Sequence, residues 1–143
     1  MINIRKATMD DCDRIYEINV KDFKYEYPYE VTKSNLEKVL NKDDHVVFVA
    51  EDEGKIIGYI EARDHIAIYA PELKDVMALV VSEEARHKGV GKKLMDTVIE
   101  WAKKDGAQGV RLTTREDRVI AHKFYEDYGF EMSKIQKNFK MMF

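Results

Sequence analysis

The feature that most constrains this chain is a basic, glycine-containing turn between an apolar strand candidate and a strongly periodic helix. Residues 76–81 form the apolar stretch, and after a polar turn the basic run at residues 86–93 leads into the helix. A helix is expected over residues 91–104, because apolar side chains recur there at helical spacing. Those side chains are Val90, Leu94, Val98 and Trp101. A strand expected at residues 108–114 completes a strand-helix-strand crossover, which favours parallel pairing of the two strands.

The other strand candidates predict a mixed sheet. Short apolar or alternating runs occur at residues 2–5, 46–51 and 56–64, and the last two are joined by a hairpin signal, Asp52-Glu53-Gly54-Lys55. The tail after Phe130 is expected to return as a further strand. Together with the crossover, this order indicates an α/β chain with a twisted mixed sheet and helices on both faces.

Three further helices are expected from their end signals. Thr8 and Asp11 resemble a capping box that opens a helix ending near residue 21. Thr32 is expected to cap a second helix through residue 40, after an aromatic and acidic loop at residues 22–31. The last helix is expected over residues 119–128 and ends at Gly129.

Composition excludes several classes of protein. The 143 residues are 45% apolar and 36% charged, and no linker or repeat interrupts them, so we expect a single domain over residues 1–143. A net charge of -3 argues against binding to nucleic acid, and no apolar run approaches the length of a membrane span or signal peptide. Cys12 is the only cysteine, which excludes an intrachain disulfide and a Cys-based zinc site. These features predict a cytoplasmic protein without a metal.

The basic turn has the chemistry of a pyrophosphate site. A helix N-terminus presents unpaired N–H groups and partial positive charge, and two glycines let the amides approach a ligand closely. A Walker A loop is excluded because Arg86 and Lys93 stand where glycine and Ser/Thr are needed, and a Rossmann fingerprint is excluded by Leu94. A solvated basic helix start without a ligand is the structural alternative.

Two motifs resemble the GNAT superfamily of N-acetyltransferases. Arg86, Gly89 and Gly91 fill the fixed positions of its motif A, Arg/Gln-x-x-Gly-x-Gly/Ala. The run AHKFYEDYGF at residues 121–130 is similar to motif B, A-x-x-F-Y-E-x-x-G-F. The resemblance is sharp over residues 74–131 and implies the GNAT-like acyl-CoA fold, with acetyl-CoA as co-substrate.

The resemblance also assigns residues to the coenzyme. Main-chain amides of the turn would hold the pyrophosphate, and the edge of the preceding strand would bond the pantetheine arm. That edge must be free, so the strand at 76–81 has to diverge from the one at 108–114. Arg118 replaces the usual motif B asparagine and is assigned to a coenzyme phosphate. The full set is Leu79, Val80, Val81, Arg86, His87, Lys88, Gly89, Val90, Gly91, Lys92 and Arg118.

The implied reaction is direct attack of a neutral primary amine on the thioester. Tyr125 is the implied general acid, and the alternative for it is a packed core aromatic. Asp75 is the first candidate for the base that removes the amine proton, followed by Glu72 and His65. Thr113 stands where other members carry a glutamate. This departure keeps open an alternative function, an acyl-CoA-binding sensor or interaction module without turnover.

The loop at residues 22–31 is the expected acceptor loop. Glu26 and Glu30 lie among tyrosines there, which would suit a cationic amine on a small molecule or a peptide. The alternative is an exposed loop whose tyrosines pack inward or form a dimer contact, so a homodimer stays open.

Overall fold

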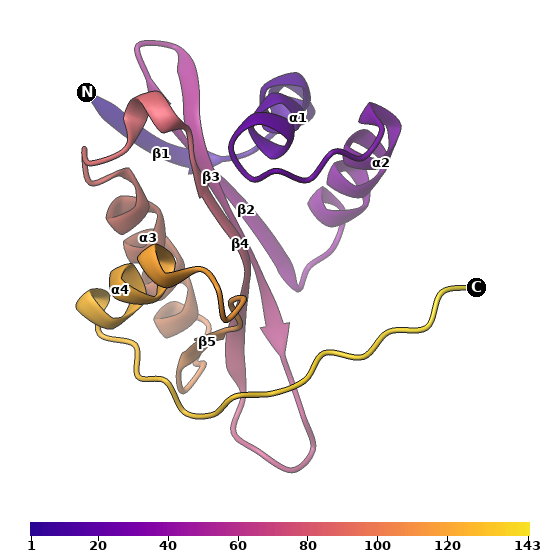
Figure 1. Ribbon diagram of the computed structural model, residues 1–143, viewed down its shortest axis with the longest axis vertical. Helices are drawn as coiled ribbons and strands as arrows, with labels where there is room; N and C mark the ends of the chain where they lie inside the picture. Colours follow the sequence, from indigo (N-terminus) through magenta and orange to yellow (C-terminus); the bar gives the residue numbers. More distant parts are fainter. The chain divides into compact units, whose positions relative to one another are not determined.

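The computed structural model describes residues 1–143 and contains one five-stranded sheet (Figure 1). The chain divides into two compact units, residues 1–113 and 114–143, and the whole sheet belongs to the first. All neighbouring strands pair antiparallel except the last two, which are parallel, so the expected mixed sheet is confirmed. In spatial order the strands are β1 (Ile2–Lys6), β2 (His45–Asp52), β3 (Lys55–His65), β4 (Leu73–Val81) and β5 (Val110–Leu112).

Helices cover both faces of this sheet, as the sequence predicts. Figure 1 shows α1 (Cys12–Lys21) and α2 (Tyr29–Leu40) on one side and α3 (Val90–Lys104) on the other. On the first side, alternate strand residues pack with Ile15 and Ile18 of α1. On the second side, the apolar stripe of α3 is buried against the sheet. This stripe includes Val90, Leu94, Met95 and Val98.

The start of α2 corrects the sequence prediction. The helix begins at Tyr29, after Pro28, so Thr32 lies in its first turn and does not cap it. A proline at a helix start costs no hydrogen bond, because its missing N–H would have no partner there. The Tyr29 hydroxyl donates to Asp13 at 2.5 Å, which fixes this start against α1.

The carboxyl-terminal unit contains α4 (Val119–Tyr128) and a tail without regular structure. The helix has the predicted bounds and ends at Gly129, whose φ of 127° favours glycine. The predicted strand after Phe130 is wrong, because residues 131–143 are exposed and pair with no strand. An extended segment gains its hydrogen bonds only from a partner strand, and this tail has none. The expectation of a single domain over residues 1–143 stays a prediction.

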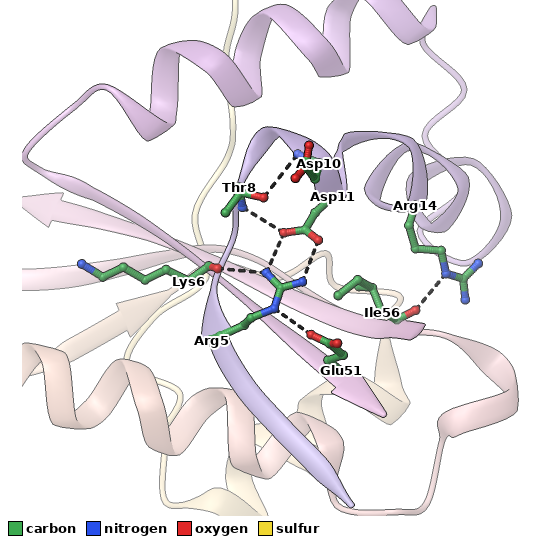
Figure 2. Close-up of polar contacts among 8 residues, drawn as sticks. All are labelled: Arg5, Lys6, Thr8, Asp10, Asp11, Arg14, Glu51 and Ile56. Carbon is green, nitrogen blue, oxygen red and sulfur yellow. Dashed lines mark hydrogen bonds and ion pairs between the residues drawn. The ribbon is translucent and has the colours of Figure 1, made fainter. Parts of the chain in front are cut away.

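A partly buried ion-pair network joins β1 to the start of α1 (Figure 2). The Arg5 guanidinium donates to both oxygens of Asp11, at 2.8 and 2.9 Å, and to Glu51 on β2 at 2.7 Å. Asp11 also accepts from the Thr8 amide at 2.8 Å, which completes the predicted capping box. Asp11 is only 6% exposed, and its bonds to Arg5 hold the pKa of its carboxyl below the usual range.

A second junction holds β4 to the end of α3. The Lys74 ammonium is fully buried, bonds to Asp64 and Asp105, and lies 4.3 Å from the centre of the Trp101 ring. Burial lowers the pKa of Lys74, but the two carboxylates outweigh that effect and raise the pKa above its usual value. The start of β4 is thereby fixed to the C-terminal end of α3, and the basic turn lies at the N-terminal end of the same helix.

No helix in the chain combines the length and the apolar character needed to cross a membrane. No group of three or more His, Cys, Asp or Glu side chains is placed to hold a metal ion.

We expect Asp11→Asn to lower the free energy of unfolding by about 2 kcal/mol at pH 7, because it weakens two charge-assisted hydrogen bonds in a buried setting. The folded pKa of Asp11 is depressed, so its contribution is present above the unfolded value of 3.8 and is lost as the pH falls through the folded value. Urea unfolding between pH 2 and 7 measures both effects. Asp10→Asn is the matched control, because Asp10 is the neighbour of Asp11 in sequence and its side chain is exposed. Equal stability losses in the two variants would contradict the role given to Asp11.

Candidate functional site

The turn before α3 presents a row of unpaired main-chain amides. His87 and Gly89 both take left-handed backbone angles, with φ of 67° and 76°, and Val90 is the first helical residue. The first helical hydrogen bond runs from the Lys93 amide to the Gly89 carbonyl at 3.1 Å. No backbone hydrogen bond is made by the amides of residues 87–92. Such a concave row at a helix N-terminus binds anions.

The carboxylate of Glu84, beside this turn, is engaged with partners elsewhere. Glu84 forms ion pairs with Lys55 at 3.0 Å and Arg14 at 3.3 Å, and the Lys55 bond holds the pKa of its carboxyl below the usual range. The Glu83 amide donates to Asp22 at 2.9 Å. These contacts fix the turn to α1 and to the β2–β3 hairpin, and the exposed side chains of Arg86 and Lys88 give the turn its positive charge.

A glycine on β3 lets α3 approach the sheet closely at this point. A Cβ atom on Gly58 would lie 2.8 Å from the Val80 carbonyl oxygen and 3.4 Å from Val90 Cγ1. The first distance is shorter than real contacts, so a larger residue would push β4 or α3 away. Gly58 therefore helps to position the helix N-terminus directly beyond the end of β4.

β4 and β5 diverge, which leaves one edge of β4 unpaired. The two strands pair only at Lys74–Val76, opposite Val110–Leu112. On the other side of β4, the register with β3 skips Met77, which marks a β-bulge. Since the Ser82 amide donates to Ile57 on β3 at 2.8 Å, alternation directs the backbone groups of Leu79 and Val81 toward the unpaired edge. The divergence that the sequence analysis required is present.

A cavity of about 600 Å³ opens between α1, α2 and the sheet. Its walls are mostly apolar and aromatic, and they include Tyr25 and Tyr27 of the expected acceptor loop. Glu26 and Glu30 are exposed and do not line it, so the acidic residues of that loop do not face this cavity. The cavity side chains are Ile15, Asn19, Phe23, Tyr25, Tyr27, Val31, Thr32, Asn35, Leu36, Lys38, Val39, Lys42, Val47, Tyr59, Glu61, Met77 and Ala78.

Glu61 is the one carboxylate in that lining, and the sequence analysis missed it. It lies on β3, opposite Val47 of β2 and Ala78 of β4. Burial raises the pKa of its carboxyl, against smaller opposite effects of His45 and Arg63. The available signal was a charged residue two positions after Tyr59, on the face of β3 that packs under the helices.

Asp75, the first candidate base, is buried between two arginines. Its carboxylate accepts from Arg111 on β5 at 2.7 Å and lies 3.6 Å from Arg63 on β3. The three residues are cross-strand neighbours in the sheet. Asp75 therefore braces the short β4–β5 pairing, and taking up a proton would weaken these ion pairs. Of the other candidates, Glu72 immediately precedes β4 and His65 ends β3, and both lie outside the cavity lining.

Tyr125 belongs to the carboxyl-terminal unit and lies in an aromatic cluster. Its ring contacts Phe124 and Phe130 edge to face, with centroids 5.5 and 5.9 Å apart. Burial raises the pKa of its phenol, and the nearby charge of Arg118 opposes this. The phenol of Tyr125 therefore stays protonated at neutral pH, and its role as the general acid stays a prediction.

Comparison with known proteins agrees with these features. The chain is 27% identical over 146 residues to an uncharacterized N-acetyltransferase of Methanocaldococcus jannaschii, covering 97% of this chain and 65% of that longer relative. It is 28% identical over 144 residues to an N-alpha-acetyltransferase of Saccharolobus solfataricus, covering 95% and 84%. The fold matches AAC(6')-Iy in complex with a CoA-containing bisubstrate analog, with a TM-score of 0.88, 19% identity and 99% of each chain covered.

The sequence model of the acetyltransferase (GNAT) family matches residues 12–130. This range includes β4, the basic turn that follows it and the last helix. This range covers most of the chain, and both motifs singled out in the sequence lie within it. The chain therefore belongs to the GNAT family of acetyltransferases.

Proposed function

We propose that this protein transfers the acetyl group of acetyl-CoA to a primary amine of a small molecule or peptide by direct attack. The observation that carries the proposal is the continuity of two binding elements, the unpaired edge of β4 and the unpaired amides of residues 87–92. An extended amide-containing arm and a pyrophosphate, joined as in coenzyme A, match these two elements in order.

The coenzyme would bind mainly through the backbone. Amides of residues 87–92 would hold the pyrophosphate, with the charges of Arg86 and Lys88 beside them. The Lys92 side chain pairs with Asp96 at 3.1 Å, so its amide is the group left for the phosphate. Leu79 and Val81 would bond the pantetheine arm as a strand partner would, with Val80 between them facing β3.

The chemistry needs a neutral amine, an oxyanion partner and a proton for the departing sulfur. The Val81 amide, on the unpaired edge, would stabilise the tetrahedral oxyanion. Tyr125 would supply the proton to the coenzyme thiolate, and its raised pKa keeps the phenol protonated at neutral pH. Asp75 is a weaker candidate for the base than the sequence suggests, because arginines engage both of its oxygens. Arg118 would reach a coenzyme phosphate.

The names of related proteins support an amine acceptor. One relative is an N-alpha-acetyltransferase, and one solved neighbour carries a bisubstrate analog of CoA and acetylneamine. A cavity of about 600 Å³ beside β4 is large enough for a small-molecule amine or the end of a peptide.

Gly89→Ala should raise the dissociation constant for coenzyme A about tenfold, because alanine costs 1–2 kcal/mol in the left-handed conformation that the turn requires. Isothermal titration calorimetry measures the change. Gly106→Ala is the matched control, since it introduces the same strain, at φ 79°, at the other end of α3. Equal weakening by both variants would show that helix stability, and not the turn, controls binding.

Wild-type protein should release coenzyme A thiol from acetyl-CoA only when an amine acceptor is present. Tyr125→Phe should lower kcat by about 100-fold with little change in KM for acetyl-CoA, because it removes a general acid. A thiol assay over a panel of amines measures both, with Tyr128→Phe of the same aromatic cluster as control. Binding of acetyl-CoA without thiol release for any amine would instead support the sensor function, and full activity of Tyr125→Phe would remove its assigned role.

A further inference from the structure

We propose that Glu61 is the acceptor-binding group of this enzyme: its carboxylate binds the acceptor as an ammonium ion in the cavity and then takes its proton. The inference rests on the proposed acetyl transfer and names the residue and the substrate class that the sequence left open.

The Glu61 carboxylate has no hydrogen-bond or ion-pair partner in the protein, whereas the buried Asp11 and Asp75 both bind arginine. A carboxylate removed from water without a partner destabilises a fold. A bound ammonium ion supplies the missing partner, and the cavity is the route by which it reaches Glu61.

This carboxylate lies in a mostly apolar cavity wall. Aromatic and aliphatic side chains form most of the wall, and desolvation by them raises the pKa of Glu61, which makes it a better proton acceptor. Few charges lie around it: His45 on β2, Arg63 on β3, Lys38 on α2, and Lys42 just after that helix. From α1 and β4 the cavity receives only uncharged side chains, which are Ile15, Asn19, Met77 and Ala78.

Glu61 also lies close to the unpaired edge of β4. Glu61 pairs directly with Ala78, and Met77 at the bulge lines the same cavity. The next residue, Leu79, begins the edge where the pantetheine arm would bind. An amine held by Glu61 therefore lies one strand away from the position proposed for the thioester.

The proton balance is complete without another reactant. The ammonium gives one proton to the Glu61 carboxylate, and its nitrogen lone pair forms the new bond to the acetyl carbon. The bond between that carbon and sulfur then breaks. The thiolate would take a proton from Tyr125, and the nitrogen gives up its second proton as the amide forms, which restores the phenol through solvent. Glu61 then releases its proton to solvent, so the reaction frees one proton overall and both side chains return to their starting forms.

The cavity favours a primary amine with one positive charge and an apolar or aromatic body. A single carboxylate matches a single ammonium, and the apolar walls match the rest of such a molecule. Lys38 and Lys42 lie in the same lining and would repel further positive charges. Phenethylamine is therefore the probe of choice, and spermidine is its polycationic counterpart.

The test compares Glu61→Gln with Glu37→Gln, an exposed glutamate on α2 outside the cavity. We expect Glu61→Gln to lower kcat/KM for phenethylamine at least 100-fold, roughly the effect of losing a general base, with unchanged affinity for coenzyme A. Glu61→Asp should restore part of the activity. The kcat/KM of the wild type should be higher for phenethylamine than for spermidine. It should fall as the pH drops through the raised pKa of Glu61. Glu61→Gln should lack this acid limb, and an unchanged limb in this variant would contradict the role of Glu61.

Two further readouts separate binding from structure. Calorimetry with phenethylamine in the presence of coenzyme A should detect binding to the wild type. Glu61→Gln should bind phenethylamine only at a much higher amine concentration. The folded pKa of Glu61 is raised above 4.5, so its ionisation costs stability as the pH rises through that value, and Glu61→Gln should have a higher Tm at pH 7. A merely structural glutamate would give a lower Tm.

The outcomes distinguish the two proposals. If wild type turns over amines and Glu61→Gln does so equally well, this inference is overturned and the acetyl transfer stands. A loss of coenzyme A affinity in Glu61→Gln, or a preference for spermidine, also overturns it. If wild type binds coenzyme A but acetylates no amine and binds no phenethylamine, both proposals fall.

Discussion

The divergence of β4 from β5 is the constraint on which the rest of this structure depends. Met77 bulges out of the pairing with β3, and only three residues of β4 pair with β5 before the strands separate. A bulge bends its strand and increases the local twist, so β4 turns away from its parallel neighbour. The same event leaves backbone groups of Leu79 and Val81 without partners and brings Met77 to the cavity wall.

The fixed frame around this divergence comes from ion pairs at its ends. Lys74 joins the start of β4 to the end of α3, and Asp75 joins three strands through its arginines. Contacts of Glu84 and Asp22 hold the turn at the other end. Because both ends of β4 are fixed, the unpaired stretch between them stays aligned with the amides of residues 87–92. Binding groups on rigid elements lose little entropy when a ligand is held.

Acidic side chains have two distinct uses in this chain. Asp11 and Asp75 are buried and bind arginine, so they contribute to the fold and are poorly suited to exchange protons. Glu61 is partly buried, faces a cavity and binds no cation of the protein. A carboxylate in this state costs stability and gains reactivity, which is the usual compromise at a functional site.

The sequence by itself determined the elements with strong local signals, together with the basic glycine turn before α3. The periodicity of α3, the capping box at Thr8 and the glycine motif at residues 86–91 are local, so neighbouring residues were enough to predict them. The predicted start of α2 was wrong because the proline competed with a weaker threonine cap. The predicted strand in the tail was wrong because a strand needs a partner strand, which the local sequence does not reveal. Only the tertiary structure decided that Asp75 is paired and that Glu61 faces a cavity, because both depend on which strands and helices come together.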